Sequence, residues 1–529
     1  MAINNSYDVN NIPAEKFQFA QRNDYKHDSK FDTKPVSYFQ GAFRRFCKNK
    51  GAVVGGIVIA CLVLFAIIAP FFTPFTPAYY DQVYALVTPK NSLFVNAGFW
   101  DGCKQKTEVG SIEYFKDYAL GLETGRDVIK NGEYEVSADG SNYTYRYDTY
   151  YGVGFGAYKI IPLDEYADIQ RYQNETGRQI LYPTVALRNR PVTTQDMNNA
   201  NYYYKTEKVG SKTRPVMDAN GNPIPVYWEY EAGETNSLIP EYNSLRIEGQ
   251  DGFTKDGKQY FYAYGRIVDG GVEVRAEYYE YYTYKHQEKY KDGIGEPSFL
   301  FGTTGTGKDI FACLAYGARF SFVFAIIVAA VNFIVGIIWG SIAGYFGGKT
   351  DLFMERFTDI LGAVPTMIII TLLKYHMGAS SQALVLFISF FATGWIGMAG
   401  TTRMQFYRFK NQEYVLAART LGASDKRIMF KHIFPNGLGT IVTSSALVIP
   451  SMIYSETNLS YLGIINLEAG NTTSVGTLIA AGQSAIIIPG AAYVAFFPCM
   501  FLVLLMLSFN LFGNGLRDAF NPSLRGAED

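Results

Sequence analysis

Metal-binding and disulfide-forming residues are scarce in this sequence. The four histidines lie far apart and belong to no paired carboxylate motif: His27, His286, His376 and His432. The five cysteines are equally scattered, with neither zinc-site spacing nor a disulfide pattern: Cys47, Cys61, Cys103, Cys313 and Cys499. The sequence therefore predicts no metal site and no bound cofactor.

An excess of charge of one sign is also missing. The formal net charge over 529 residues is -1, which leaves no electrostatic bias toward nucleic acid or another polyanion. The mean hydropathy is -0.01. This average combines stretches almost free of charge with one long polar stretch, as in a membrane protein with a large water-exposed domain.

Long apolar runs are what the sequence does have. Residues Ala52–Phe72 carry no charge and are long enough to cross a hydrocarbon layer of roughly 30 Å at about 1.5 Å per helical residue. We predict six membrane-spanning helices, of which the third is the shortest: Ala52–Phe72, Phe320–Tyr345, Ile360–Leu373, Ala383–Ala399, Leu438–Ser455 and Ile486–Phe512.

Basic residues flank these spans unevenly. One group precedes the first span: Arg44, Arg45, Lys48 and Lys50. A second group fills the loop between the fourth and fifth spans: Arg403, Arg408, Lys410, Arg419, Lys426, Arg427 and Lys431. The loop Ile464–Ala485 has no lysine or arginine. Because cytoplasmic loops carry the excess of basic residues, we expect both termini and the loop 403–436 to face the cytoplasm.

This orientation divides the chain into a cytoplasmic segment 1–50, a first span 51–72, an extracellular insertion 73–300 and a membrane domain 301–529. The insertion is long enough to fold as a domain and holds most of the 41 tyrosines. Runs such as Tyr202-Tyr203-Tyr204 and Tyr278-Tyr279-Glu280-Tyr281-Tyr282 alternate with charged residues and with Asp-Gly and Asn-Gly turns. This pattern predicts a β-rich or α+β fold, whose tyrosines act either as ordinary strand residues or in ligand or partner contact.

One motif resembles a nucleotide-binding loop. Gly302-Thr-Thr-Gly-Thr-Gly307-Lys308 fits the first seven positions of a phosphate-binding loop. Asp309 stands where such a loop needs Ser or Thr to ligate magnesium, and an aspartate repels phosphate. The motif also falls on the outer side of the second span, where ATP is scarce. We interpret it as a glycine-rich turn that leads into a helix.

The polar stretch between the fourth and fifth spans begins with a helical pattern. Tyr414, Ala417 or Ala418, and Leu421 recur at three- and four-residue spacing, so they share one face of a short helix. Alanines on that face let the backbone of another protein come close. The pattern is typical of a docking element that a membrane subunit offers to a separate motor protein.

A turn and a second helix follow. Gly422 is expected to take the left-handed conformation that ends the first helix, and Ser424 or Asp425 to cap the second. Pro435 is expected to close the second helix, since the residue before a proline disfavours helical geometry. The whole stretch predicts a compact, exposed helical element.

Several stretches resemble the C-type permease subunits of ABC importers for oligopeptides and dipeptides. FRRFCKNKGAVVGGIVI is similar to the family's basic lead into its first span, and FGTTGTGKDIFACLAYGARFS to its approach to the second. Later blocks follow in the family's order: GSIAGYFGGKTDLFMERFTDI, EYVLAARTLGASDKRIMFKHIFPN, SETNLSYLGI and FNLFGNGLRDAFNP. The resemblance covers the first span and everything after about Ser298, and the insertion is absent from short members of the family.

The resemblance implies a type I ABC importer permease fold, in which 301–529 is the permease domain and Glu413 to Pro435 seats in a groove on an ATPase subunit. Ala417, Ala418 and Gly422 fall on signature positions, whereas Leu416 replaces the acidic residue of the general importer signature. The implied coupling residues are Glu413, Tyr414, Ala417, Ala418, Leu421, Gly422, Ser424, Arg427 and Pro435.

The resemblance also implies the partners and the location. The expected assembly contains this permease, a homologous second permease, two ABC ATPase subunits and an extracellular peptide-binding lipoprotein. It would carry peptide substrates across the plasma membrane of a bacterium, in contact with membrane lipid and without nucleic acid. The chain lacks a complete phosphate loop and an ATPase signature, so we expect a transport subunit rather than an enzyme.

Ionisable residues within or beside spans are costly and often functional. Asp359, Lys374 and Glu456 are therefore candidates for the pathway or its gate. The competing interpretation places Asp359 and Lys374 at the membrane interfaces and gives Glu456 a capping role at a span end.

Two other functions fit parts of the sequence. A membrane-anchored receptor or adhesin would act through its tyrosine-rich outer domain, but it would need one span rather than six. A membrane NTPase would use Gly302–Lys308, whose fit fails at Asp309.

Overall fold

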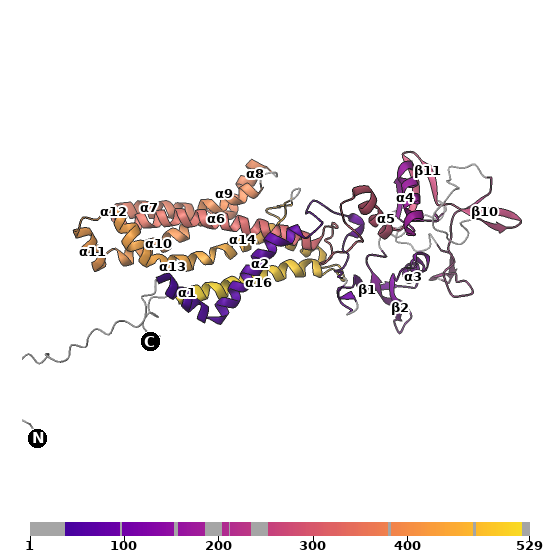
Figure 1. The fold of residues 1–529 in the computed structure, drawn as a ribbon, viewed down its shortest axis with the longest axis horizontal. Coiled ribbons are helices and arrows are strands. Elements are labelled where there is room, and N and C mark those ends of the chain that lie inside the picture. The colour runs from indigo at the N-terminus through magenta and orange to yellow at the C-terminus, as the bar shows by residue number, and fades with distance from the viewer. Residues whose placement is uncertain are drawn as a thin grey trace, which may run out of the picture.

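The structure, a computed structural model, describes residues 38–520 apart from 92, 96–97, 153–156, 186–203, 211, 234–251, 379–381 and 469–471. Segment 1–37 of the predicted N-terminal region and the tyrosines Tyr202 and Tyr203 lie outside the described residues. The molecule is elongated, with a helical bundle at one end and an α/β insertion at the other (Figure 1).

The bundle is assembled from helices on both sides of the insertion. Two precede it: α1 (Tyr38–Lys48) and α2 (Lys50–Ile68). The others follow it: α6 (Ile310–Phe346), α7 (Gly348–Gly362), α8 (Thr366–Met377), α9 (Gln382–Gly394), α10 (Ile396–Phe409), α11 (Glu413–Thr420), α12 (Asp425–Arg427), α13 (Phe434–Ala446), α14 (Val448–Tyr461), α15 (Val475–Ala485) and α16 (Tyr493–Phe520). A π-helical stretch, Ile428–Ile433, joins α12 to α13.

Five helical runs among the described residues are long and apolar enough to cross a membrane: Lys50–Phe71, Ile310–Phe346, Gln382–Phe409, Asp425–Tyr461 and Tyr493–Phe520. Helices α7 and α8 pass the same test together but are bent by 66° relative to each other, and they make a sixth if the pair counts as one span. The prediction of a polytopic helical membrane protein with a β-rich insertion is confirmed.

Two predicted span limits are wrong. Ile360–Leu373 is not one helix, because α7 ends at Gly362 and α8 starts at Thr366. Pro365 lacks the amide hydrogen that would continue the α7 ladder, so the chain bends there. The last span starts at Tyr493 rather than Ile486, because a turn with Gly490 at φ +80° precedes it.

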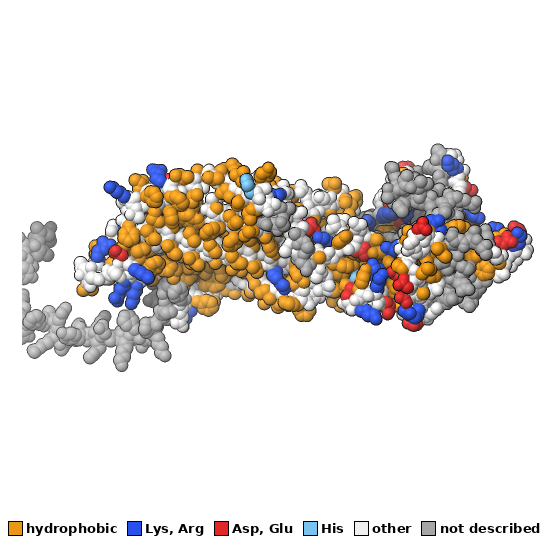
Figure 2. Space-filling view, turned by 90° about the horizontal axis from the view of Figure 1, so that it is seen from above, with side chains coloured by type: hydrophobic (Ala, Val, Ile, Leu, Met, Phe, Trp, Pro, Cys, Tyr) orange, Lys and Arg blue, Asp and Glu red, His pale blue; other side chains and the backbone are white. Residues whose placement is uncertain are grey.

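Hydrophobic side chains cover the bundle as a band, whereas lysines and arginines gather at its end remote from the insertion (Figure 2). The middle turns of α2 and α16 expose apolar side chains. Ile57 and Leu64 of α2, and Val503 and Leu507 of α16, are each more than half exposed. A face of this kind suits contact with lipid.

Helices α6 and α10 approach each other closely. Gly336, Gly340 and Gly344 recur every four residues, so they share one face of α6. That face lies against α10, where the nearest groups belong to Met398, Ala399, Thr402, Arg403 and Phe406. A Cβ at any of the three glycines would collide with these groups, so only glycine permits the contact.

The insertion contains two units with the same order of elements. The first comprises β1 (Cys103–Val109), α3 (Ile112–Thr124), β2 (Ile129–Val136) and β3 (Asn142–Asp148), in the antiparallel order β1-β3-β2. The second comprises β4 (Ala157–Ile161), α4 (Leu163–Thr176), β11 (Gly265–Val268) and β12 (Gly271–Ala276), in the antiparallel order β4-β12-β11.

The remaining strands lie between α4 and β11 in sequence. β5 (Leu181–Tyr182) pairs with β12. β6 (Thr206–Val209) pairs with β7 (Lys212–Pro215), while β10 (Lys258–Tyr262) pairs with both β8 (Glu229–Glu231) and β9 (Phe253–Lys255).

The two units also repeat a sequence pattern. Glu113-Tyr114 of α3 correspond to Glu165-Tyr166 of α4, and Glu123-Thr124-Gly125-Arg126 correspond to Glu175-Thr176-Gly177-Arg178. The glycines end their helices at φ +67° and +71°. Both arginines then form ion pairs with Glu280. Element order, sequence and contacts agree, so the insertion contains an internal repeat.

The tyrosine run that was predicted as strand is helical. Tyr278–Tyr284 forms α5, and each of its five tyrosines is at most 6% exposed. They pack in one core with Tyr84, Tyr150 and Phe299. Ligand contact by this run is therefore excluded in the folded state, and its tyrosines act as core residues.

We predict that Gly340→Ala lowers the stability of the protein by about 1–3 kcal/mol, the usual cost of overpacking a close contact. The new methyl group would meet the Ala399 carbonyl oxygen and the Thr402 side chain. Thermal unfolding in detergent measures the change. Gly400→Ala is the matched control on α10, because a Cβ there meets open space; equal melting temperatures for the two variants would contradict the packing argument.

Candidate functional site

The first predicted docking helix is α11, which begins at Glu413. It ends in a Schellman motif, in which the Gly422 amide donates to the Arg419 carbonyl and the Ala423 amide to the Ala418 carbonyl, both at 3.0 Å. The motif needs a left-handed residue, and Gly422 has φ +80°. The predicted conformation of Gly422 is confirmed.

The second helix departs from its prediction. Ser424 stands at the N-cap of α12, but its side chain makes no capping hydrogen bond. Pro435 does not close the helix, because the run continues from Asp425 to Tyr461. Proline is tolerated in the first turn of α13, where it follows the π-helical stretch and its missing amide removes no α-helical bond.

Helices α11 and α12 and the turn between them carry every predicted coupling residue except Pro435, and they lie at the end of the bundle remote from the insertion (Figure 1). We call the exposed side of residues 413–436 the predicted coupling surface. Tyr414 is 40% exposed and Leu421 is 87% exposed. The hydroxyl of Tyr414 accepts a hydrogen bond from Asn436 at 3.2 Å. The other members are exposed, except for Ala418, which is half-buried: Glu413, Ala417, Ala418, Gly422, Ser424, Arg427 and Pro435.

A small core holds this surface in place. Val415, Ile428 and Ile433 are fully buried and pack on Phe406 of α10 and Tyr345 of α6. Burial of an aliphatic side chain contributes about 1.5–3 kcal/mol. The surface therefore rests on the ends of two spans instead of hanging on a loose loop.

Tyr345, which the sequence analysis did not single out, joins both arms of the surface. Its hydroxyl donates to Asp425 Oδ1 at 2.5 Å and accepts from Arg419 at 3.4 Å. Asp425 thus binds a side chain of α6 instead of capping α12. The signal in the sequence is only a tyrosine at the end of an apolar run, which does not reveal a tertiary partner.

Arg403 of α10 clamps α7 next to this surface. Its guanidinium forms two bonds to Asp351, at 2.6 and 2.7 Å, and two to Glu355, both at 2.8 Å. The Tyr407 hydroxyl donates to Asp351 at 2.6 Å. Bidentate charged pairs of this kind fix geometry as well as energy, so this contact holds α7 against α10.

The three ionisable candidates for a pathway or gate lie apart. Asp359 is exposed and pairs only with Arg356 among the described residues, at 3.2 Å. Lys374 donates to the Ile464 carbonyl at 2.5 Å, which ties α8 to the segment after α14. Both residues lie near the ends of their helices, Asp359 in α7 and Lys374 in α8.

Glu456 is fully buried inside the bundle. It accepts hydrogen bonds from Ser474 at 2.6 Å, Ser460 at 2.9 Å and Ser321 at 3.3 Å. These serines come from the N-cap of α15, from α14 and from α6. Glu456 therefore joins three helices and does not cap a span end.

The segment Gly302–Lys308 has no free cradle for a phosphate. The amides of Thr304 and Gly307 bond within the turn at 2.9 Å, and the Thr303 amide bonds to Val87 at 3.1 Å. Lys308 Nζ binds Glu468 at 2.5 Å. The interpretation as a turn that leads into a helix is confirmed, since α6 begins at Ile310 with Asp309 as its N-cap. Among the described residues no group of three or more His, Cys, Asp and Glu side chains is placed to hold a metal ion.

Together these features define a polytopic membrane protein with an exposed helix–turn–helix surface at one end of its bundle and without a nucleotide site in the described segment Gly302–Lys308. Residues 336–526 match the family model for the binding-protein-dependent transport system inner membrane component, and residues 37–89 match that for the N-terminal TM domain of oligopeptide transport permease C.

Three bacterial relatives match the membrane part. The oligopeptide transport system permease protein OppC of Bacillus subtilis is 42% identical over 228 residues, 42% of this chain and 72% of that protein. The dipeptide permease DppC of the same organism is 38% identical, over 42% of this chain and 69% of DppC. Escherichia coli OppC is 36% identical, over 44% and 74%.

A solved chain of the MetNI methionine ABC transporter in an inward-facing conformation shows 16% identity and a TM-score of 0.33, and the match covers 40% of this chain and 96% of that chain.

The chain belongs to the OppC/DppC-type family of binding-protein-dependent transport permeases. It is a permease subunit of the oligopeptide and dipeptide class of ABC importer, and such subunits carry no ATPase domain. By homology it is a multi-pass protein of the bacterial inner membrane.

We predict that Lys308→Ala leaves ATP hydrolysis by the assembled importer unchanged, because Lys308 serves only to bind Glu468. Glu468→Ala removes the same ion pair from the other side and is the matched control. ATP turnover in detergent or vesicles measures both. A loss confined to Lys308→Ala would assign Lys308 to a nucleotide site.

Proposed function

We propose that this chain forms half of the membrane pathway of an importer that moves oligopeptides into a bacterial cell, and that the surface 413–436 receives the motion of separate ATPase subunits. The observation that carries the proposal is the exposed face of α11 and its turn, seated on the ends of α6 and α10. The coupling residues are Glu413, Tyr414, Ala417, Ala418, Leu421, Gly422, Ser424, Arg427 and Pro435.

The proposed orientation puts this surface in the cytoplasm, together with both termini. Lysines and arginines gather at the same end of the bundle (Figure 2), as expected of the cytoplasmic side. Segment 1–50 then lies inside, 51–72 is the first span, 73–300 lies outside the cell, and 301–529 forms the permease domain with its coupling loop 403–436.

Motion at the coupling surface has two direct routes into the spans. One runs through Tyr345, which contacts both arms of the surface and ends α6. The other runs through α10, which continues toward the surface from Arg403 and its clamp on α7. ATP binding would stabilise one arrangement of the spans over another through differential contact with this surface.

The proposed partners are a homologous second permease, two ABC ATPase subunits and an extracellular peptide-binding lipoprotein that delivers peptides to the outer side. Relatives named for oligopeptide and dipeptide transport support peptides as the cargo. Asp359 and Glu456 remain the proposed candidates for the pathway or its gate; Asp359 is exposed and pairs with Arg356, and Glu456 accepts hydrogen bonds from three serines.

A receptor or adhesin that acts through the insertion alone is disfavoured. Such a protein has no use for a docking surface built on the far ends of two spans, and the prominent tyrosines of α5 are buried.

We predict that Gly422→Asp abolishes peptide uptake while the protein still reaches the membrane. A side chain at φ +80° costs about 1–2 kcal/mol, too little to unfold the protein, and the new carboxylate enters the middle of the coupling surface. Uptake of a labelled peptide and membrane content are measured together. Gly305→Asp is the control, because Gly305 has open space on the other side of the molecule; normal uptake by Gly422→Asp would sink the proposal.

A milder change tests the route through α6. Tyr345→Phe keeps the buried ring but removes the hydroxyl that binds Asp425 and Arg419. We expect the complex to assemble and to hydrolyse ATP with fewer peptides moved per ATP. If the number of peptides moved per ATP is unchanged, the route through Tyr345 is rejected and the motion passes to the spans through α10. Tyr375→Phe, on an 85% exposed tyrosine, controls for the substitution itself.

A further inference from the structure

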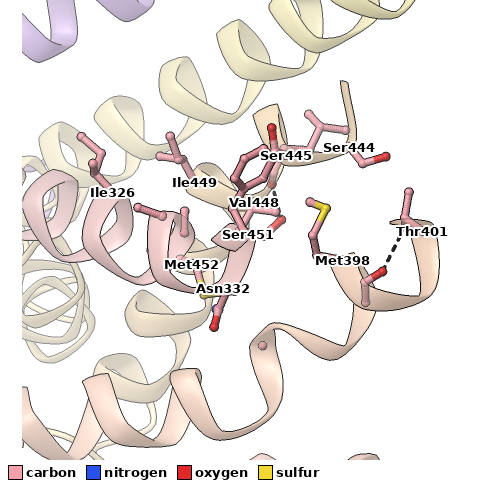
Figure 3. Close-up of a pocket in the computed structure, with 16 residues that line it drawn as sticks. Ile326, Asn332, Met398, Thr401, Ser444, Ser445, Val448, Ile449, Ser451 and Met452 are labelled. Carbon is pink, nitrogen blue, oxygen red and sulfur yellow. Dashed lines mark hydrogen bonds between the residues drawn. The ribbon is translucent and has the colours of Figure 1, made fainter. Parts of the chain in front are cut away.

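A cavity of about 530 Å³ opens between α6, the α9–α10 break and the α13–α14 run. Figure 3 shows its walls, with Asn332 from α6, Met398 and Thr401 from α10, and Ser444, Ser451 and Met452 from the α13–α14 run. Its lining holds serine, threonine, asparagine, glycine and hydrophobic side chains and contains no Asp, Glu, Lys or Arg.

Asn332 is an unusual component of this wall. Its side chain is 2% exposed, and its amide nitrogen makes one long hydrogen bond, 3.4 Å, to the Phe390 carbonyl. Its amide oxygen has no hydrogen-bond partner among the described residues. A buried acceptor without a donor costs about 1–3 kcal/mol. The described residues supply no donor to this oxygen, so a donor from another molecule would stabilise the site.

The serines of the opposite wall also present acceptors. Ser451 donates its hydroxyl hydrogen to the Leu447 carbonyl at 2.7 Å, and Ser444 donates to the Thr440 carbonyl at 3.0 Å. Both hydroxyl hydrogens are thus in use, and the remaining lone pairs accept hydrogen bonds from other groups. The Asn332 oxygen and these hydroxyl lone pairs supply the cavity with several oxygen acceptors, whereas the side-chain N–H donors of its lining belong to Asn332 alone.

The exposed side of the α13–α14 run differs from the lipid-facing side of α2 and α16. Thr440, Ser451 and Tyr454 lie on its exposed side, whereas α16 exposes Val503, Leu507 and Leu511. Polar groups are unfavourable against hydrocarbon. The α13–α14 side is therefore better suited than the α16 face to contact with water, substrate or protein.

We propose that this cavity is a contact site for the main chain of a translocating peptide, and that Asn332, Ser444 and Ser451 accept hydrogen bonds from its N–H groups. The inference rests on the proposed function. A peptide supplies a row of N–H donors whatever its sequence. The absence of charge in the wall and the adaptable side chains of Met398 and Met452 leave room for varied side chains.

Cysteine labelling in the assembled importer tests the site. Ser451→Cys and Thr401→Cys are made singly in a chain whose five native cysteines have been replaced and which still takes up peptide. Vesicles are treated with a charged thiol reagent that does not enter lipid, with and without tetra-alanine. We expect both cysteines to react, and near-saturating peptide to slow the reaction roughly tenfold, since the rate follows the unoccupied fraction.

Leu507→Cys on the apolar face of α16 is the matched control, and it should react only with a lipid-soluble maleimide. Three results would overturn the site. The cysteines at 451 and 401 could behave like Leu507→Cys, which would place them against lipid. They could react with neither reagent, as expected if the second permease covers them, or they could be labelled at a rate that peptide does not slow. Uptake is measured in the same vesicles, so failure of labelling with uptake intact rejects the site alone. Failure of the importer assembled with the unchanged chain to move any peptide would reject the proposed function as well.

Discussion

The close contact between α6 and α10 is the constraint on which the rest of the structure depends. Gly336, Gly340 and Gly344 bring the two backbones together, because glycine alone leaves no side chain between them. α6 has 37 residues, a length of about 55 Å at 1.5 Å per residue. One continuous helix therefore connects the Asp309 cap, next to the insertion, with Tyr345 at the surface 413–436.

The insertion is joined to the outer end of this bundle by packed aromatic rings. Phe301, just before α6, stacks on Phe497 of α16 with ring centroids 4.0 Å apart, and Trp100 stacks on the same ring at 6.2 Å. The Lys308–Glu468 ion pair adds a connection to the segment after α14. The insertion is therefore packed directly against the end of the bundle that is remote from residues 413–436, and any partner that approaches the bundle from that end meets it.

The charged side chains Arg403 and Glu456 of the bundle have partners within the protein. Arg403 is neutralised by Asp351 and Glu355, and Glu456 is surrounded by three serine hydroxyls. Such pairing is required where water is absent. Five buried side-chain oxygens of the bundle have no such partner among the described residues: Asn332 Oδ1, Ser341 Oγ, Thr402 Oγ1, Gln405 Oε1 and Thr457 Oγ1. Of these residues, Asn332 is the one that lines the cavity.

The sequence by itself determined the class of protein, the presence of several apolar spans, the helix–turn–helix with its left-handed Gly422, and the failure of Gly302–Lys308 as a phosphate loop. These features follow from local chemistry: hydropathy over a window, the freedom of glycine, and the wrong residue at Asp309. The repeat of Glu-Thr-Gly-Arg at Arg126 and Arg178 was also in the sequence, but its meaning became visible only when both arginines met Glu280.

Only the tertiary structure decided which residues act together. Tyr345 and Asp425 are far apart in the chain, as are Arg403 and Asp351, and their partners depend on how α6, α7 and α10 pack. The same holds for the tyrosines of α5, which have strand propensity but form a buried helix, because burial in the core of the insertion outweighs a weak local preference. Pro435 lies inside a continuous helical run for a similar reason. The π-helical turn before it is anchored by the buried side chains of Ile428 and Ile433, and after this turn the missing amide hydrogen of Pro435 breaks no α-helical bond. A proline in the sequence does not by itself predict such a turn.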